Sequence, residues 1–260
     1  MQLTLRQQQI MSAARDAGRV TVDDLSQSFE VTPQTIRRDL NTLCEAKLLV
    51  RAHGGALLAS GIENVRYEQR QSLASEEKLA IGRLCAEQIP DNSSLFINIG
   101  TTTEAVAQAL LQHRNLMVVT NNLNVANILL QNTSFEIIIA GGVLRHADRG
   151  ITGEATVDFI KQFKLDYAVI GASALDDEGA LLDFDYREVR VTQAILNNAR
   201  ERFLVVDQSK LERTAPVRVG HVSQLTGLFI DELGSEGLAA VCEENGVVTY
   251  QLSNHLTPFL

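Results

Sequence analysis

Cysteine is scarce in this 260-residue sequence, and tryptophan is absent. The three cysteines, Cys44, Cys85 and Cys242, are odd in number and far apart, so neither a disulfide framework nor a metal knuckle is expected. No stretch approaches the roughly 18 consecutive apolar residues that a membrane-spanning helix needs. The N-terminus also lacks the apolar core of a signal peptide. We therefore expect a cytoplasmic protein with no membrane partner.

The sequence is also short of positive charge, with a formal net charge of −9 that, taken alone, argues against a nucleic-acid partner. Its 45% hydrophobic content excludes a disordered chain. The charge is distributed unevenly, because residues 1–58 carry seven basic and six acidic side chains and the remainder carries a net charge of −10. This asymmetry indicates two parts with different tasks.

Residues 1–58 have the pattern of a winged helix-turn-helix domain. Apolar spacing predicts helices over 4–17 and 22–29, and Thr21 is placed to cap the second. Thr32 and Pro33 begin a third helix after a short turn, so the helix-turn-helix covers about 20–39. Two short apolar runs around a loop with two glycines then predict a β-hairpin over 48–58, which forms the wing.

One face of the third helix is polar, and amide and guanidinium groups at such positions bond base edges in the major groove. The candidate DNA-contacting residues are Thr32, Gln34, Thr35, Arg37, Arg38, Asn41, Arg51 and His53. An arginine pair alone is more typical of a solvated helix face, but the capped turn and the wing favour DNA binding. For His53 a plain turn role and a DNA contact remain equally open.

Residues 59–75 are predicted to be a linker, 76–252 a ligand-sensing domain and 253–260 a tail. In the sensing domain short apolar runs alternate with helical patterns, which predicts a mainly parallel sheet covered on both faces. The expected strands are 95–99, 117–120, 136–140, 167–171, 202–206, 228–230 and 247–249. The expected helices are 76–88, 103–112, 122–131, 155–162 and 187–199. The fold class is thus α+β overall, with a winged helix-turn-helix followed by an α/β domain.

Ligands of such sheets bind beyond the carboxyl ends of the strands, where this sequence places glycines, hydroxyls, amides and two cations. The candidate ligand-binding residues are Gly100, Thr101, Thr102, Thr103, Asn121, Asn122, Gly141, Gly142, Arg145, Glu188 and Lys210. A glycine and hydroxyls at a helix start suit a phosphate, and Arg145 and Lys210 are candidate countercharges. Glu188 could equally be an acid that stabilises a helix N-terminus.

Two stretches carry a resemblance to a known family: residues 32–40 (TPQTIRRDL) and 51–56 (RAHGGA) resemble the DeoR family of bacterial repressors. Runs in the second part, such as 99–102 (IGTT), 120–127 (TNNLNVAN) and 207–210 (DQSK), are similar to its sensor domain. That domain is related to ribose-5-phosphate isomerase and CoA-transferase folds. The resemblance therefore implies a repressor of a carbon-catabolism regulon, without catalytic activity, cofactor or metal.

The resemblance further implies double-stranded operator DNA as partner, a homo-oligomer (dimer or tetramer) and a phosphorylated effector, for which glycerol 3-phosphate is expected. Two alternatives remain open: an isomerase-like sugar-phosphate enzyme with a DNA-binding module, and a DeoR-type regulator that responds to another sugar phosphate. An activator is not excluded by any residue.

Overall fold

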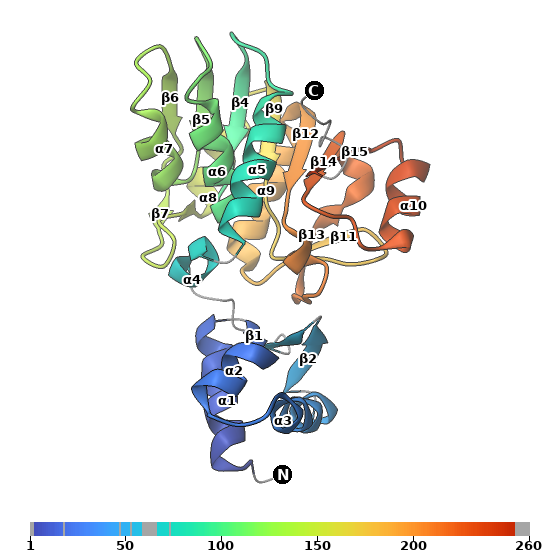
Figure 1. Ribbon diagram of the computed structural model, residues 1–260. Helices are drawn as coiled ribbons and strands as arrows, with labels where there is room; N and C mark the ends of the chain where they lie inside the picture. Colours follow the sequence, from blue (N-terminus) through green and yellow to red (C-terminus); the bar gives the residue numbers. More distant parts are fainter. Residues whose placement is uncertain are drawn as a thin grey trace, which may run out of the picture.

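The computed structural model describes residues 3–17, 19–46, 48–52, 54–58, 67–72 and 74–252 (Figure 1). The predicted tail 253–260 and most of the predicted linker lie outside these residues. Among the described residues, no helix is both long and apolar enough to cross a membrane.

The N-terminal domain is the predicted winged helix-turn-helix, with helices α1 (Leu5–Ala17), α2 (Val22–Ser28) and α3 (Pro33–Glu45). The predicted caps form, because the Thr21 hydroxyl accepts from the Asp24 amide at 3.1 Å and the Thr32 hydroxyl from the Thr35 amide at 3.3 Å. The apolar faces of the three helices meet in one core, whose fully buried members include Ile10, Ile36, Leu40 and Leu43.

The wing has a third strand that the sequence pattern did not predict. Strands β2 (Leu49–Ala52) and β3 (Gly55–Leu58) form the expected hairpin, and β1 (Arg19–Thr21) pairs antiparallel with β3. A Cβ atom at Gly55 would lie 1.9 Å from the Val20 carbonyl oxygen. Gly55 is therefore required for the close approach of β1, whereas the turn needs Gly54, which has φ +73°.

Asp39 joins the first and third helices. It is 7% exposed, and its carboxylate accepts hydrogen bonds from Arg6 Nε at 2.5 Å and Gln7 Nε2 at 3.1 Å. The residue before it in the sequence, Arg38, therefore points away with the exposed face of α3.

The second domain contains a seven-stranded sheet in the order β15-β14-β12-β9-β4-β5-β6. All of its neighbouring strands are parallel, which confirms the predicted α/β class. The strands are β4 (Ser94–Ile97), β5 (Met117–Thr120), β6 (Glu136–Ile139), β9 (Leu165–Ile170), β12 (Ala199–Val205), β14 (Gly227–Ile230) and β15 (Val248–Gln251).

Helices cover both faces of this sheet (Figure 1). One face packs on α5 (Ser75–Ala86), α6 (Thr101–Leu110) and α7 (Leu123–Leu129), and the other on α8 (Glu154–Ile160) and α9 (Tyr186–Asn197). The helix α10 (Glu236–Glu244) adds Leu238 and Cys242 to the second of these cores.

Short antiparallel strands that were not predicted from the sequence surround the sheet. Strand β7 (Val143–Leu144) pairs with β8 (Ile151–Thr152), and β11 (Ala180–Asp183) lies between β10 (Ala174–Leu175) and β13 (Val217–His221). Because β11 ends three residues before α9 begins, it fixes the start of α9. A further short helix, α4 (Tyr67–Ser72), lies within the segment that was predicted to be a linker.

The contact between α5 and α6 yields a stability prediction. A Cβ atom at Gly82 would lie 2.7 Å from the backbone carbonyl of Ala105, which no side-chain rotation can relieve. Overpacking of this kind costs about 1–3 kcal/mol, against about 1 kcal/mol gained when a helical glycine becomes alanine. We expect Gly82→Ala to lower the urea midpoint of the sensor domain. Gly141→Ala is the control, since a Cβ there meets nothing within 4 Å, and equal midpoints for the two variants would contradict the packing argument.

Candidate functional site

The exposed face of α3 carries the candidate DNA-contacting residues. Gln34, Arg37, Arg38 and Asn41 are all exposed. Their spacing places them along one side of the helix, opposite the buried Ile36, Leu40 and Leu43. A helix that presents amide and guanidinium groups in this way can enter the major groove and bond base edges.

The remaining candidates of this domain have different positions. Thr32 and Thr35 lie at the start of α3, where their hydroxyls are 2.9 Å apart and Thr32 caps the helix. Arg51 is exposed on β2, in the wing. His53 lies outside the described residues. The helix face and the wing residue together form a candidate nucleic-acid interface.

A cavity of about 30 Å³ lies at the carboxyl ends of the central strands of the sheet. Six of the candidate ligand-binding residues line it: Gly100, Thr101, Thr102, Thr103, Glu188 and Lys210. The other lining residues are Arg70, Ile99, Gly171, Ala172, Ser173, Asp183 and Val205. The cavity therefore combines residues that follow β4, β9 and β12, which are adjacent in the sheet.

The wall after β4 is a helix N-terminus suited to an anion. Gly100 is the N-cap of α6 with φ +151°, a backbone conformation that side chains rarely adopt, and no side-chain hydrogen bond caps the helix. The N–H groups of its first turn have no partners within the helix, and the helix dipole favours negative charge there. This wall has the geometry that binds phosphate groups in other proteins.

Lys210 supplies positive charge to the same cavity. It ends a 3₁₀ turn (Gln208–Lys210) after β12, and its side chain is buried at 7% exposure. Burial and the neighbouring Arg213 guanidinium lower the pKa of Lys210 to about 7. An anion in the cavity would stabilise the protonated amine and raise this pKa again.

Two carboxyl groups, those of Asp183 and Glu188, line the same cavity as Lys210. Burial raises the pKa of Asp183, and burial together with the Asp183 carboxylate raises the pKa of Glu188. Both groups therefore take up protons more readily than ordinary acids, which reduces their repulsion of an anion. In the ionised form they can accept hydrogen bonds from ligand hydroxyls.

Four predicted ligand-binding residues do not line the cavity. Asn121 Nδ2 donates to the Ile151 carbonyl at 3.0 Å, and Asn122 Nδ2 donates to Glu104 Oε1 at 3.0 Å. Gly141 and Gly142 follow β6, which is the edge strand beyond β5. The strand order explains the difference, because β5 and β6 end beside the cavity-forming strands rather than among them.

Arg145 does not line the cavity either, and the structure places it in an ion-pair cluster. Its guanidinium donates to Asp185 Oδ2 at 3.1 Å, to Glu188 Oε2 at 2.7 Å and to both carboxylate oxygens of Asp148. Burial alone would lower the pKa of Arg145, but the carboxylates of Glu188 and Asp148 raise it. Its guanidinium is thus paired with three carboxyl groups, of which Glu188 also lines the cavity.

Arg70 is the basic residue of the cavity that the sequence analysis did not predict. It lies on α4, in the polar segment that was predicted to be a linker, and its side chain is 15% exposed. No periodicity or neighbouring motif marks it. The one indication is indirect: a phosphate site would need a second cation beside Lys210, because Arg145 is already paired with carboxyl groups. Among the described residues, no group of three or more His, Cys, Asp or Glu side chains is placed to hold a metal ion.

Comparison with known protein families shows to which family the chain is related. Residues 6–61 match the model of the DeoR-like helix-turn-helix domain, and residues 73–232 match the model of the DeoR C-terminal sensor domain. The chain belongs to the DeoR family. The resemblance drawn from the sequence is thereby confirmed.

Several DeoR-family relatives are similar over nearly their whole length. The glycerol-3-phosphate regulon repressor of Escherichia coli is 51% identical over 89% of this chain and 92% of that protein. The protein of the same name from Haemophilus influenzae is 48% identical over 94% of this chain and 95% of that one. The transcriptional repressor CsqR of Escherichia coli is 40% identical over 93% of each chain.

Among solved structures, the translation initiation factor eIF-2B of Pyrococcus horikoshii has a TM-score of 0.50 and 14% identity over 87% of this chain and 95% of that one. This likeness concerns the fold alone. A D-ribose-5-phosphate isomerase in complex with phospho-erythronic acid has a TM-score of 0.39 and 19% identity over 53% of this chain and 54% of that one, and nothing about chemistry follows from it.

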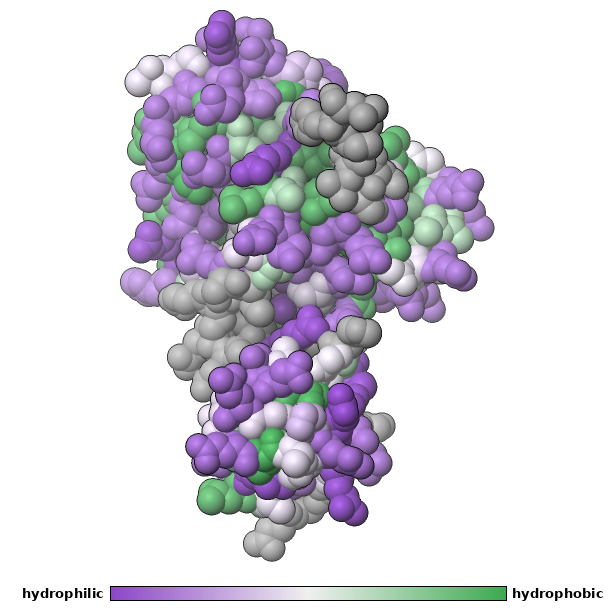
Figure 2. All heavy atoms as spheres, in the orientation of Figure 1, coloured by the Kyte–Doolittle hydropathy of each residue, from purple (hydrophilic) through white to green (hydrophobic). Residues whose placement is uncertain are grey.

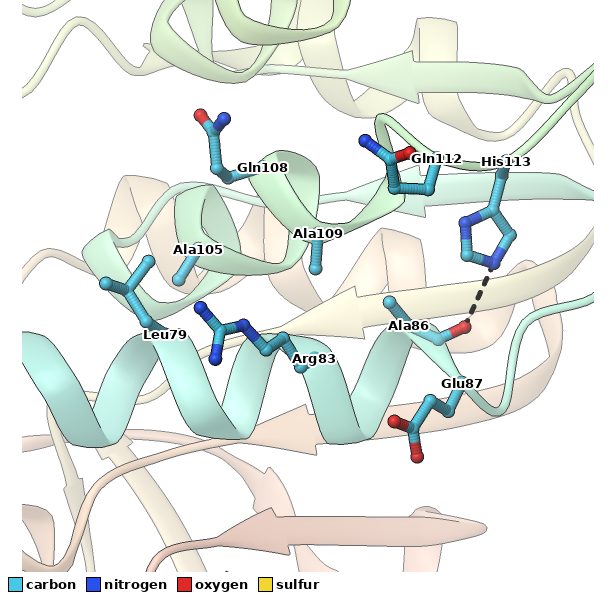
Figure 3. A pocket seen from close by; sticks show the side chains of 9 residues that line it. All are labelled: Leu79, Arg83, Ala86, Glu87, Ala105, Gln108, Ala109, Gln112 and His113. Carbon is cyan, nitrogen blue, oxygen red and sulfur yellow. Dashed lines mark hydrogen bonds between the residues drawn. The ribbon is translucent and has the colours of Figure 1, made fainter.

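A larger groove of about 460 Å³ lies between α5 and α6 (Figure 3). Ala86, Ala105 and Ala109 lie between the helices, and the His113 ring points toward α5, where it hydrogen-bonds the Ala86 carbonyl. Figure 2 shows green, apolar patches over these helices on a mostly hydrophilic face. The groove has no helix N-terminus, and its middle is apolar, so it is unsuited to a phosphate. The cavity at the strand ends is the better candidate for the ligand site of this DeoR-family chain.

The Arg145 cluster yields a second prediction. Removing one partner of a buried ion pair costs about 3–5 kcal/mol, because the remaining charges lose their compensation. We expect Arg145→Gln to lower the urea midpoint clearly, whereas Arg190→Gln, which removes the exposed pair with Glu154, changes stability by less than about 1 kcal/mol. Unchanged stability together with lost phosphate affinity in Arg145→Gln would assign Arg145 to the ligand site instead.

Proposed function

We propose that this chain is a DNA-binding transcriptional repressor of a carbon-catabolism regulon, that of glycerol-3-phosphate metabolism, and that a phosphorylated metabolite releases it from its operator. The relatives named above are repressors, and two of them are named for the glycerol-3-phosphate regulon. The observation that carries the proposal is the exposed polar face of α3, with Gln34, Arg37 and Arg38, next to a wing.

The partner of this face is double-stranded operator DNA. We assign Thr32, Thr35 and Arg51, beside the recognition surface, to phosphate contacts, which orient a protein on the duplex. We propose a homo-oligomer, a dimer or a tetramer, acting in the cytoplasm. A dimer would present two α3 helices to successive major grooves, about 34 Å apart.

The proposed effector is glycerol 3-phosphate, bound at the carboxyl edge of the parallel sheet. Its phosphoryl group would bind the first-turn amides of α6 and the Lys210 ammonium, and its hydroxyls would face Asp183 and Glu188. The proposal assigns binding without turnover to this site. Because operator and effector binding are linked, each must weaken the other by the same factor.

The experiment that tests the function measures DNA binding and release together. Operator sequences are selected from a random library with the full-length protein, and the operator Kd is then measured with and without glycerol 3-phosphate. Fructose 6-phosphate and deoxyribose 5-phosphate serve as competing effectors. A rise in Kd with glycerol 3-phosphate is expected, a rise with another sugar phosphate alone would correct the effector, and turnover of any of them would contradict the proposal.

Recognition by α3 makes a specific prediction. Arg37→Ala and Arg38→Ala should each weaken operator binding by at least about tenfold per lost base or phosphate contact and lower the salt dependence of log Kd. Arg187→Ala is the matched control, because it removes an exposed arginine of the sensor domain. Effector binding should be retained in all three variants, as measured by titration calorimetry. Equal operator affinity for wild type and both α3 variants would place the interface elsewhere.

The depressed pKa of Lys210 makes the effector affinity pH-dependent. At about pH 7 and above, the ligand-free protein loses the Lys210 proton, and anion binding must restore it. The affinity for glycerol 3-phosphate should therefore fall by up to about tenfold per pH unit above 7, with proton uptake visible as a buffer-dependent binding enthalpy. Lys210→Met should bind weakly and lose most of this slope, and an affinity that rises with pH would contradict the assignment.

A further inference from the structure

Helix α4 lies in the sequence between the two domains of the chain. Strand β3 ends at Leu58, α4 spans Tyr67–Ser72, and α5 begins at Ser75. Only residues 59–66 therefore separate α4 from the wing of the DNA-binding domain. Any displacement of α4 that reaches that domain along the chain would have to pass through these eight residues.

Hydrogen bonds on two sides join α4 to the sensor domain. The Tyr67 hydroxyl donates to Glu104 Oε2 at 2.6 Å and accepts from Asn124 Nδ2 at 2.9 Å. Burial and the Glu104 carboxylate raise the pKa of Tyr67, so this donor keeps its proton at physiological pH. On the other side of α4, Lys78 Nζ donates to the backbone carbonyl of Arg70.

The guanidinium of Arg70 is only loosely paired. Its Nη2 atom lies 3.7 Å from Asp148 Oδ2, beyond ordinary hydrogen-bond length, and Asp148 is already bonded to Arg145. The Nε atom of Arg70 is buried and has no hydrogen-bond partner among the described residues. A buried cationic donor without an acceptor is costly, so an anion in the cavity would supply what Arg70 lacks.

The size of the cavity requires part of its wall to move. A volume of about 30 Å³ is close to that of one water molecule and is small for glycerol 3-phosphate. The amides of α6 are fixed by the sheet and Lys210 by the turn after β12. Arg70 is the lining residue carried by a short helix outside the sheet and its covering helices, so we expect it to be the part of the wall that moves.

We propose that Arg70 binds the phosphoryl group of the effector and that this contact is the link through which effector binding shifts α4 and releases the DNA-binding domain. The proposal rests on the function proposed above and adds the route of regulation. The incoming dianion exchanges the long Asp148 contact of Arg70 for direct hydrogen bonds. Helix α4 then shifts together with Arg70, and this shift displaces the wing, to which α4 is joined by residues 59–66.

The test separates effector affinity from coupling, which is the ratio of operator Kd values with and without saturating glycerol 3-phosphate. In Arg70→Gln we expect this ratio to fall to within about twofold of unity, even at saturation, because the link is missing. Lys210→Met is the matched control, because it also weakens effector binding. At saturating effector, its ratio of operator Kd values should return to the wild-type value, since Arg70 remains. Arg70→Lys keeps the positive charge but loses the guanidinium that can bind a phosphate with two hydrogen bonds, so it should give an intermediate ratio.

A second measurement reports on α4 directly. Amide hydrogen exchange over 67–72 should change when glycerol 3-phosphate saturates the wild type and Lys210→Met, and should stay constant in Arg70→Gln. A wild-type ratio in Arg70→Gln at saturation would overturn the coupling role and leave the proposed function intact. A wild type that binds operator but is released by no phosphorylated metabolite would overturn the proposed function, and this inference with it.

Discussion

Burial of charge at the carboxyl edge of the parallel sheet is the constraint on which the sensor domain depends. Lys78, Lys210, Asp183 and Asp207 are each less than a tenth exposed there. Removing such groups from water costs several kcal/mol each, so every one of them must face opposite charge. Lys78 Nζ lies 4.0 Å from Asp207 Oδ2, and Arg145 meets three carboxylates. Because partners are shared, one added anion changes the balance of the whole set.

The same constraint connects the sheet edge to the rest of the chain. Asp148 bridges the Arg145 cluster to Arg70 on α4, and Glu104 connects the first turn of α6 to Tyr67 on the same helix. Helix α4, which follows the DNA-binding domain in the sequence, thus contacts residues around the candidate ligand site. A bound anion would compete for the shared partners of this cluster, and an element that changes its pairing on binding can couple distant sites.

Local signals were sufficient to predict the strands of the parallel sheet and most of the helices, and insufficient to predict the short antiparallel strands or which elements are neighbours. The caps at Thr21 and Thr32 and the apolar runs of the strands are encoded within a few residues, and the structure has the corresponding helices and strands. Strand β1 depends on pairing with residues 36 positions away, and the strand order that removes Asn121 from the cavity is likewise non-local. Arg70 lines the cavity in place of the predicted Arg145 for the same non-local reason, because tertiary contacts decide which carboxylates pair with an arginine.

The division of charge between the domains bears on how such a repressor could be released. The N-terminal 58 residues carry a net charge of only +1, and the remainder carries −10, so the overall field does not attract DNA. In the homo-oligomer proposed above, binding would then rest on a few well-placed contacts from each α3 and on the spacing of two copies at successive major grooves. Affinity that depends on spacing is sensitive to small displacements. A movement of α4 that a single phosphoryl group can drive would misplace one recognition helix relative to the other, without any need to unfold the domain or block its surface.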